Sequence, residues 1–243
     1  MADDTIVFDY HFLWPDQNNA EVQFRVELDA HTLDQVRATP VSPPEWTRLD
    51  VNQCRICPLD SQQCQYCPVA LSLSDLVEHF NQLLSYARVE TTVTTKERTI
   101  VGKTTVQKAL SSLIGLKMAT SGCPILSKLK PMARFHLPFA TRDETIFRSA
   151  GAYLLAQYFL KKRGGAADLD LAGLSKIYDL VHAVNVGLAQ RLRSIAAGDA
   201  HINAIVLLDL FAQELPYSIE DNLAAVEYMF APYFESADRP AHP

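Results

Sequence analysis

The sequence has no apolar run long enough to cross a membrane. Its longest apolar stretches, such as residues 150–155 and 202–208, are much shorter than the roughly 18 residues that a membrane-spanning helix needs. The first residues, Met1-Ala-Asp-Asp-Thr, are acidic and lack the basic start of a secretory signal. We therefore expect a cytoplasmic protein that has no membrane partner.

Positive charge is also scarce. The chain has 22 Lys and Arg against 28 Asp and Glu, which gives a net charge of −6 at pH 7. Proteins that bind nucleic acid generally depend on Lys and Arg to neutralise phosphates, and an acidic chain is poorly suited to this. The composition therefore argues against a nucleic-acid partner.

Glycine is missing where a nucleotide-binding loop would need it. The segment Gly102-Lys103-Thr104-Thr105 has the ending of a P-loop, but such a loop requires another glycine five residues before the final Gly-Lys pair. Glu97 occupies that position, and its carboxylate would repel a phosphate. We interpret the segment instead as the start of a helix with a threonine cap.

The first hundred residues contain the patterns of two β-hairpins. Residues 21–28 alternate polar and apolar side chains, which is the period of a strand with one buried face. Residues 6–12 are rich in strand formers, and the Pro-Asp-Gln-Asn-Asn segment at 15–19 has turn chemistry. Residues 88–95 and 98–101 predict a second hairpin that turns at Lys96-Glu97.

The rest of the chain has mostly helical patterns. We expect one helix that starts at a Ser74-Asp75 cap, a second over Val106–Met118, and a third that opens with a capping box at Thr141–Glu144. Three further helices are expected near 170–196, 200–214 and 219–231, the last with Ser218 as its cap. The predicted fold class is α+β, with a small antiparallel sheet and a cysteine-rich loop in residues 1–105 and an α-helical bundle in residues 106–243. These two parts can also form one integrated domain.

What the sequence does have is an unusual arrangement of five cysteines. Cys57, Cys67 and Cys123 are each followed by proline, and four of the five cysteines form two Cys-x-x-Cys pairs within residues 54–67. Thiolates this close together usually bind a metal, form disulfides or do redox chemistry. Stable disulfides are the exception in a reducing compartment, so metal binding or redox chemistry is favoured.

Two ligand sets remain open. A single zinc ion would take the local quartet Cys54, Cys57, Cys64 and Cys67, although the six-residue spacer between the pairs is short. A [4Fe–4S] cluster spreads its ligands more widely and commonly takes three from a local run and one from far away, and proline after a ligating cysteine recurs in ferredoxin-type runs. The proline pattern favours the second set, which is Cys54, Cys57, Cys67 and Cys123.

The cluster interpretation leaves Cys64 outside the site and joins the two predicted parts of the chain through Cys123. It predicts a metal-binding protein for electron transfer or redox sensing, with an unidentified protein or redox partner. The zinc interpretation predicts a structural site in a protein-interaction module. Isolated buried cysteines are a third interpretation, but the residues between these four are too polar for a core.

Cys123 also has the features of a reactive cysteine. Gly122 can end one helix and Pro124 can start another, which places the thiol at a helix N-terminus where the dipole favours thiolate. His136 follows in a basic stretch and could act as a base for a cysteine-dependent enzyme. A metal ligand needs the same thiolate, and a histidine between Phe135 and Leu137 is more often structural.

Four elements of the sequence resemble an uncharacterised bacterial domain family. They are Cys54–Leu59, Cys67–Ala70, Met118–Pro124 and Pro131–Phe139, and the resemblance covers most of the chain. It implies no activity. It implies that the family pattern includes Cys54, Cys57, Cys67 and Cys123, and that Cys64 lies outside it.

Overall fold

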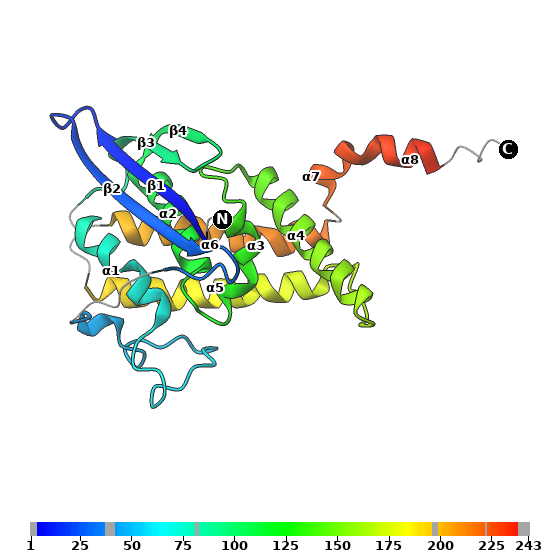
Figure 1. Cartoon of the computed structure of the whole chain (residues 1–243), viewed down its shortest axis with the longest axis horizontal. Helices are drawn as coiled ribbons and strands as arrows, with labels where there is room; N and C mark the ends of the chain where they lie inside the picture. Colours follow the sequence, from blue (N-terminus) through cyan, green and yellow to red (C-terminus); the bar gives the residue numbers. More distant parts are fainter. Residues whose placement is uncertain (1–3, 37–41, 81–82, 196–198, 222, 238–243) are drawn as a thin grey trace. The chain divides into compact units, whose positions relative to one another are not determined.

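A four-stranded antiparallel sheet and a set of helices make up the structure (Figure 1), which confirms the predicted α+β class. The structure is a computed structural model and describes residues 4–36, 42–80, 83–195, 199–221 and 223–237.

The sheet consists of the two predicted hairpins. Its strands are β1 (Thr5–Trp14), β2 (Ala20–Asp29), β3 (Arg88–Thr94) and β4 (Thr99–Thr105), in the order β2-β1-β3-β4. One face of the sheet is buried. Alternate residues of a strand point to the same side, so every second residue of β1 lies on this face. These residues form an aromatic row whose members are Phe8, Tyr10, Phe12 and Trp14.

The helical segments follow the predicted order. They are α1 (Pro68–Phe80), α2 (Val106–Ala119), α3 (Lys130–Arg134), α4 (Arg142–Lys162), α5 (Ala172–Arg193), α6 (Ala200–Glu220), α7 (Ala224–Glu227) and α8 (Ala231–Ala237), with 3-10 turns η1 (Glu45–Thr47), η2 (Leu126–Leu129) and η3 (Tyr228–Phe230). The apolar face predicted for α2 is confirmed, because Leu110, Leu113 and Ile114 are all buried. The capping box of α4 is also confirmed, with the Glu144 amide donating to the Thr141 hydroxyl.

Two predicted helix starts are wrong. Ser74 lies inside α1, which begins at Pro68, because proline is well suited to the first helical position. Ser218 lies inside α6, where its hydroxyl donates to the Glu214 carbonyl at 3.0 Å, and the helix continues through Pro216. The helix start expected after Gly102 is confirmed, because β4 ends at Thr105 and α2 begins at Val106 with Thr105 at its N-cap position, although the Thr105 side chain makes no capping hydrogen bond.

Packing explains the glycine that suggested a phosphate-binding loop. A Cβ at position 102 would lie 2.7 Å from the ring of Phe139, so a larger residue would push that ring away. Gly102 therefore allows close contact between β4 and Phe139, and no nucleotide is needed to account for it.

The chain forms two compact units. Unit 1 contains residues 1–139 and 180–210, and unit 2 contains residues 140–179 and 211–243. In unit 1, rings that include Phe12, Phe24 and Phe80 pack between the sheet and α1, with ring centroids 5.3 to 6.0 Å apart. The boundary expected near residue 105 stays a prediction.

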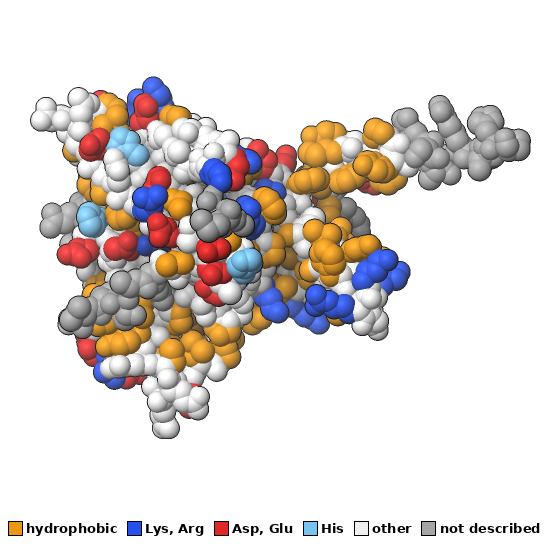
Figure 2. Space-filling view, in the orientation of Figure 1, with side chains coloured by type: hydrophobic (Ala, Val, Ile, Leu, Met, Phe, Trp, Pro, Cys, Tyr) orange, Lys and Arg blue, Asp and Glu red, His pale blue; other side chains and the backbone are white. Residues whose placement is uncertain are grey.

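Unit 2 exposes many apolar side chains. Figure 2 shows hydrophobic side chains gathered at the surface, and those of unit 2 include Leu155, Phe159 and Tyr233. Phe147 of α4 stacks on Phe230 of η3, with ring centroids 6.3 Å apart. This stacking attaches the C-terminal helical segment to α4.

Among the described residues, α6 is long and apolar enough to span a membrane by length and composition. A core helix of a water-soluble protein meets the same criterion, and Ala200, Ala204 and Ile205 of α6 are buried. The expected absence of a membrane partner stays a prediction.

Candidate metal centre

The segment between η1 and α1 carries the cysteine run, and backbone hydrogen bonds close its two ends. The Leu49 amide donates to the Gln65 carbonyl at 2.9 Å, and the Cys67 amide donates to the Thr47 carbonyl at 2.8 Å. Thr47 and Leu49 are themselves buried. The residues between these pairs therefore form a loop, which we call the cysteine loop, that is anchored in the core at its base.

Two tight turns shape the cysteine loop. In the first, the Cys57 amide donates to the Cys54 carbonyl at 3.0 Å, which is the compact turn that lets two sulfurs approach one metal group. In the second, the Cys64 amide donates to the Asp60 carbonyl at 2.8 Å, and the Asp60 carboxylate accepts the Gln62 amide. Asp60 therefore acts as a turn-forming residue.

Cys67 and Cys123 have the same local design. Each is followed by proline, and each carbonyl accepts an amide four residues later at 2.9 Å, from Leu71 and Ser127 respectively. Cys67 thus stands at the start of α1, and Cys123 starts a turn that leads into η2 rather than the regular helix expected there. At Cys123, burial raises the pKa of the thiol, and backbone amides at the start of its turn act against this effect.

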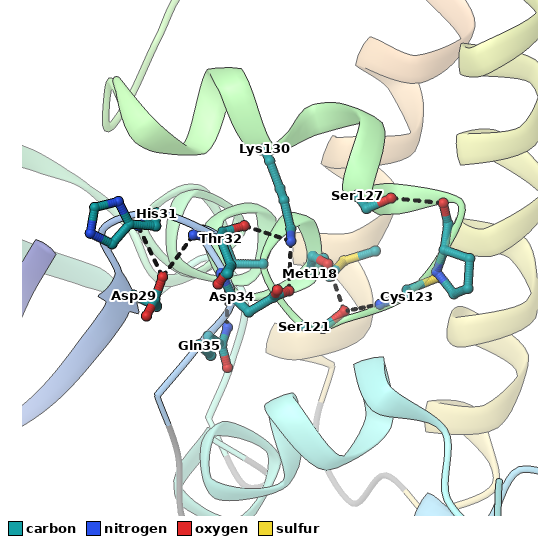
Figure 3. Close-up of polar contacts among 12 residues, drawn as sticks. Asp29, His31, Thr32, Asp34, Gln35, Met118, Ser121, Cys123, Ser127 and Lys130 are labelled. Carbon is teal, nitrogen blue, oxygen red and sulfur yellow. Dashed lines mark hydrogen bonds and ion pairs between the residues drawn. The ribbon is translucent and has the colours of Figure 1, made fainter. Parts of the chain in front are cut away.

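Serine side chains hold the Cys123 turn in place (Figure 3). The Ser121 hydroxyl donates to the Met118 carbonyl at 2.8 Å and accepts the Cys123 amide at 3.2 Å. The Ser127 hydroxyl donates to the Pro124 carbonyl, also at 2.8 Å. The end of α2 therefore fixes the position of the Cys123 backbone.

An ion pair ties the next turn to the chain that follows β2. Lys130 at the start of α3 donates to the Thr32 carbonyl at 2.8 Å and pairs with the Asp34 carboxylate at 2.7 Å (Figure 3). The Gln35 amide donates to the Thr120 carbonyl, three residues before Cys123. The segment after β2 thus supports the Cys123 turn from the side of the sheet.

Four cysteines line one small cavity of about 30 Å³. Apolar side chains and one arginine complete its wall, whose members are Leu49, Leu59, Pro68, Val69, Ile125, Val184, Leu188 and Arg191. The cysteines are Cys54, Cys57, Cys67 and Cys123. The structure thus brings Cys123 together with three cysteines that lie more than fifty residues before it.

Cys64 is placed differently. It does not belong to the cavity wall, and its thiol donates to the Tyr66 carbonyl at an S···O distance of 3.2 Å. All five cysteines are free thiols in the structure.

One wall of the cavity comes from α5, which the sequence analysis missed. Its contributing residues are Val184, Leu188 and Arg191, and Gly187 lies on the same helical face. A Cβ at position 187 would lie 2.7 Å from the Cys54 sulfur, so only glycine allows this close approach. Positions 184, 187, 188 and 191 lie on one face of a helix, and this spacing was the only sequence pattern that could have indicated a contribution of α5 to the cavity.

Arg191 joins α5 to the base of the cysteine loop. Only 2% of the residue is exposed, and its guanidinium donates to the carbonyls of Trp46, Arg48 and Leu49. A buried cation with three carbonyl partners positions the loop and also brings positive charge to the cavity.

Two of the thiols, those of Cys54 and Cys123, are in an environment that opposes ionisation. Burial, followed by the neighbouring Cys67 and Cys57, raises the pKa of Cys54 to about 11, and the Arg191 charge partly offsets this. Burial also raises the pKa of Cys123, while the backbone amides of Leu126 and Ile125 act in the opposite direction. The charge of a bound metal group would compensate this cost of thiolate formation.

His136 does not share the cavity of Cys123. Its Nε2 atom lies 2.5 Å from the Tyr10 hydroxyl and 3.3 Å from the Ser112 hydroxyl. It lines a separate cavity beside the sheet. The structure therefore places three other thiols in the cavity of Cys123 and places His136 in another cavity.

The donor set fits a soft metal group, because thiolates are the ligands of zinc and of iron–sulfur clusters. The cavity has room for about one or two waters, so a four-iron cluster could enter only if the cysteine loop moved outward. Among the described residues, no three His, Cys, Asp or Glu side chains form a group that could hold a single metal ion.

A family model described as a domain of unknown function, DUF6901, matches residues 6–231. Comparison with curated proteins and with solved structures gives no significant match.

Proposed function

The chain belongs to the DUF6901 family of domains of unknown function, and we propose that it is an iron–sulfur protein. Four thiols would hold the cluster, those of Cys54, Cys57, Cys67 and Cys123. The observation that carries this proposal is the shared cavity of these four cysteines, with Cys64 bonded to a backbone carbonyl elsewhere.

The surroundings of the four thiols suit such a group. When bound, an iron–sulfur cluster supplies one-electron transfer at a potential that depends on hydrogen bonds to sulfur and on access of solvent. Burial raises the pKa of Cys123, and the amides of Leu126 and Ile125 partly offset this. Prolines 58, 68 and 124 carry no N–H, so each keeps its cysteine from having a donor at the next backbone position.

Arg191 gives the site one fixed positive charge. Thiolates make a cluster site anionic, and a buried guanidinium that also bonds three loop carbonyls reduces this negative charge. The arginine therefore has a positioning role towards the loop and an electrostatic role towards the sulfurs.

A change at the cluster would reach the rest of unit 1 through α2. This helix ends at Ala119, and serine hydrogen bonds link its last turn to Cys123. A redox sensor and an electron carrier would both use this connection, the first to pass on a structural change and the second to keep the site rigid. The proposed partner is a redox protein, and the proposed compartment is a reducing one such as the bacterial cytoplasm.

Anaerobic purification followed by analysis of iron, zinc and acid-labile sulfide tests the proposal. We expect a brown protein in which iron and sulfide are present in equal amounts, with visible absorption that bleaches on exposure to dithionite or air. A colourless protein with stoichiometric zinc and no sulfide would contradict it and would favour the structural zinc site.

A further inference from the structure

Unit 1 contains a second cavity, which we call the His136 cavity, of about 160 Å³. It lies between the β3–β4 hairpin and the segment that follows α3. Sheet residues such as Ile6, Phe8 and Ile100 give it an apolar side, and no residue of its wall lines the cysteine cavity. The proposed metal site therefore does not account for this cavity.

Hydrogen bonds fix the imidazole that lines the cavity. Tyr10 is 1% exposed, and its hydroxyl lies 2.9 Å from the Ser112 hydroxyl and 2.5 Å from His136 Nε2. Burial raises the pKa of Tyr10 well above its usual range, so this hydroxyl keeps its proton and remains a donor. The ring of Phe8 packs at right angles to the imidazole, with centroids 5.6 Å apart. The His136 ring is thus held in one orientation.

Two arginines add positive charge to the same wall. Arg98 comes from the start of the β4 side of the hairpin, and Arg134 comes from the end of α3, where its guanidinium lies 5.2 Å from the centre of the Phe135 ring. The carboxylate of Glu97 also belongs to the wall, but it accepts a hydrogen bond from the Thr95 hydroxyl at 3.1 Å within its own turn. The cavity therefore combines an apolar side with a cationic side.

We infer that the His136 cavity binds a small organic acid, with its carboxylate between Arg98 and Arg134 and its hydrocarbon part against Ile6, Phe8 and Ile100. Guanidinium groups recognise carboxylates well because their planar N–H groups match two oxygens. The volume is below the roughly 300–1,000 Å³ of sites for drug-sized ligands, so the acid has only a few carbons. This inference is independent of the cluster.

Hexanoate is a suitable probe, since it has one carboxylate and a short apolar chain. In a ¹H–¹⁵N NMR titration of the full chain with sodium hexanoate, the amide signals of Val93, Arg98 and His136 should shift and reach saturation. Hexanol tests the need for charge, and inorganic phosphate tests the need for an apolar part. Both should bind at least tenfold more weakly than hexanoate, which is roughly the effect of one lost charge-assisted hydrogen bond.

Matched variants locate the site. Arg98→Gln and Arg134→Gln should each weaken hexanoate binding by about tenfold. Arg88→Gln, which changes an exposed residue at the start of β3 outside the cavity, should leave hexanoate binding unchanged. Because Arg98 lies in an exposed turn, that variant is expected to fold even if Arg134→Gln does not.

Three results would overturn the inference. One is the absence of saturable shifts with hexanoate. Another is equal binding of hexanol, which would mean a purely apolar cavity. The third is phosphate binding as strong as hexanoate binding, which would mean a site for inorganic anions.

Discussion

The two cavities of unit 1 are built in opposite ways. The cysteine cavity is small and apolar. Its thiols come from the cysteine loop, the start of α1 and the turn before η2, and α5 supplies another part of its wall. The His136 cavity is larger and cationic, and hydroxyls from β1 and α2 fix its imidazole before any ligand is present. We therefore propose that an added cation completes the first cavity, whereas the second is already formed for a small ligand.

This difference predicts where each cavity is vulnerable. Changes in the packing of α5 should affect the cysteine cavity and leave the His136 cavity intact. Changes in the hydroxyls behind His136 should do the reverse. A change at either place that disturbs both cavities equally would show that the two cavities are not independent.

The largest effect is expected at Arg191. Arg191→Met leaves three buried carbonyls without their donor, so the free energy of unfolding should fall by roughly 3 kcal/mol or more. Urea denaturation measures this. Arg193→Met, two residues later on the exposed side, is the matched control and should change stability by less than about 0.5 kcal/mol. Equal effects of the two changes would show that Arg191 does not hold the loop.

A smaller effect is expected at Gly187. The methyl group of Gly187→Ala would meet the Cys54 sulfur, so stability should fall by about 1–3 kcal/mol and metal content should fall with it. Gly151→Ala in α4 is the control, because no atom lies within 4 Å of its Cβ position, and it should stabilise the protein by about 0.5–1 kcal/mol. Thermal melts and metal analysis of both variants test this, and unchanged metal content in Gly187→Ala would contradict the close packing.

His201, a histidine outside both cavities, should give the protein an acid sensitivity. It is buried at the start of α6, and burial lowers its pKa although the Asp199 charge opposes this. The unfolded chain therefore binds a proton more readily than the folded one, so stability should fall as the pH is lowered from about 6.5 towards the lowered pKa. The slope is at most about 1.4 kcal/mol per pH unit. Urea denaturation of His201→Leu between pH 7.5 and 5.5 should show a smaller pH dependence than the original chain, and an identical slope would rule out this histidine as the cause.

The smallest effect is expected at Tyr10. Tyr10→Phe removes one hydroxyl, while Ser112 and His136 remain in hydrogen-bond reach of each other, so the loss should be about 1 kcal/mol. Hexanoate binding should weaken, and the rate at which the metal-free cysteines react with iodoacetamide should stay the same. A change in that rate would show that the two cavities are coupled.

The sheet could be predicted from the sequence because the patterns that indicate its strands and turns are local. Alternation in residues 21–28 and turn chemistry at 15–19 depend only on neighbours, and β1 and β2 pair as expected. The start of α1 was missed because Ser74 has the chemistry of a cap, while Pro68 begins the helix two turns earlier.

The cysteine site was only partly predictable, because some of the residues around it have no distinctive sequence pattern. The Cys-Pro pattern singled out Cys123 as a companion of Cys54, Cys57 and Cys67, and the four do line one cavity. The contribution of α5 could not be derived, because a stripe of Val184, Gly187, Leu188 and Arg191 is indistinguishable in sequence from any half-buried helix face. Likewise, nothing in the sequence connects Tyr10 and Ser112 with His136.

Metal loading of two single variants tests the central claim most directly. After anaerobic reconstitution with iron and sulfide, Cys64→Ser should retain the iron and the visible absorption of the original chain, and Cys123→Ser should lose most of both. The reverse result, in which Cys64→Ser loses the metal and Cys123→Ser keeps it, would contradict the account and assign the metal to the local quartet of cysteines.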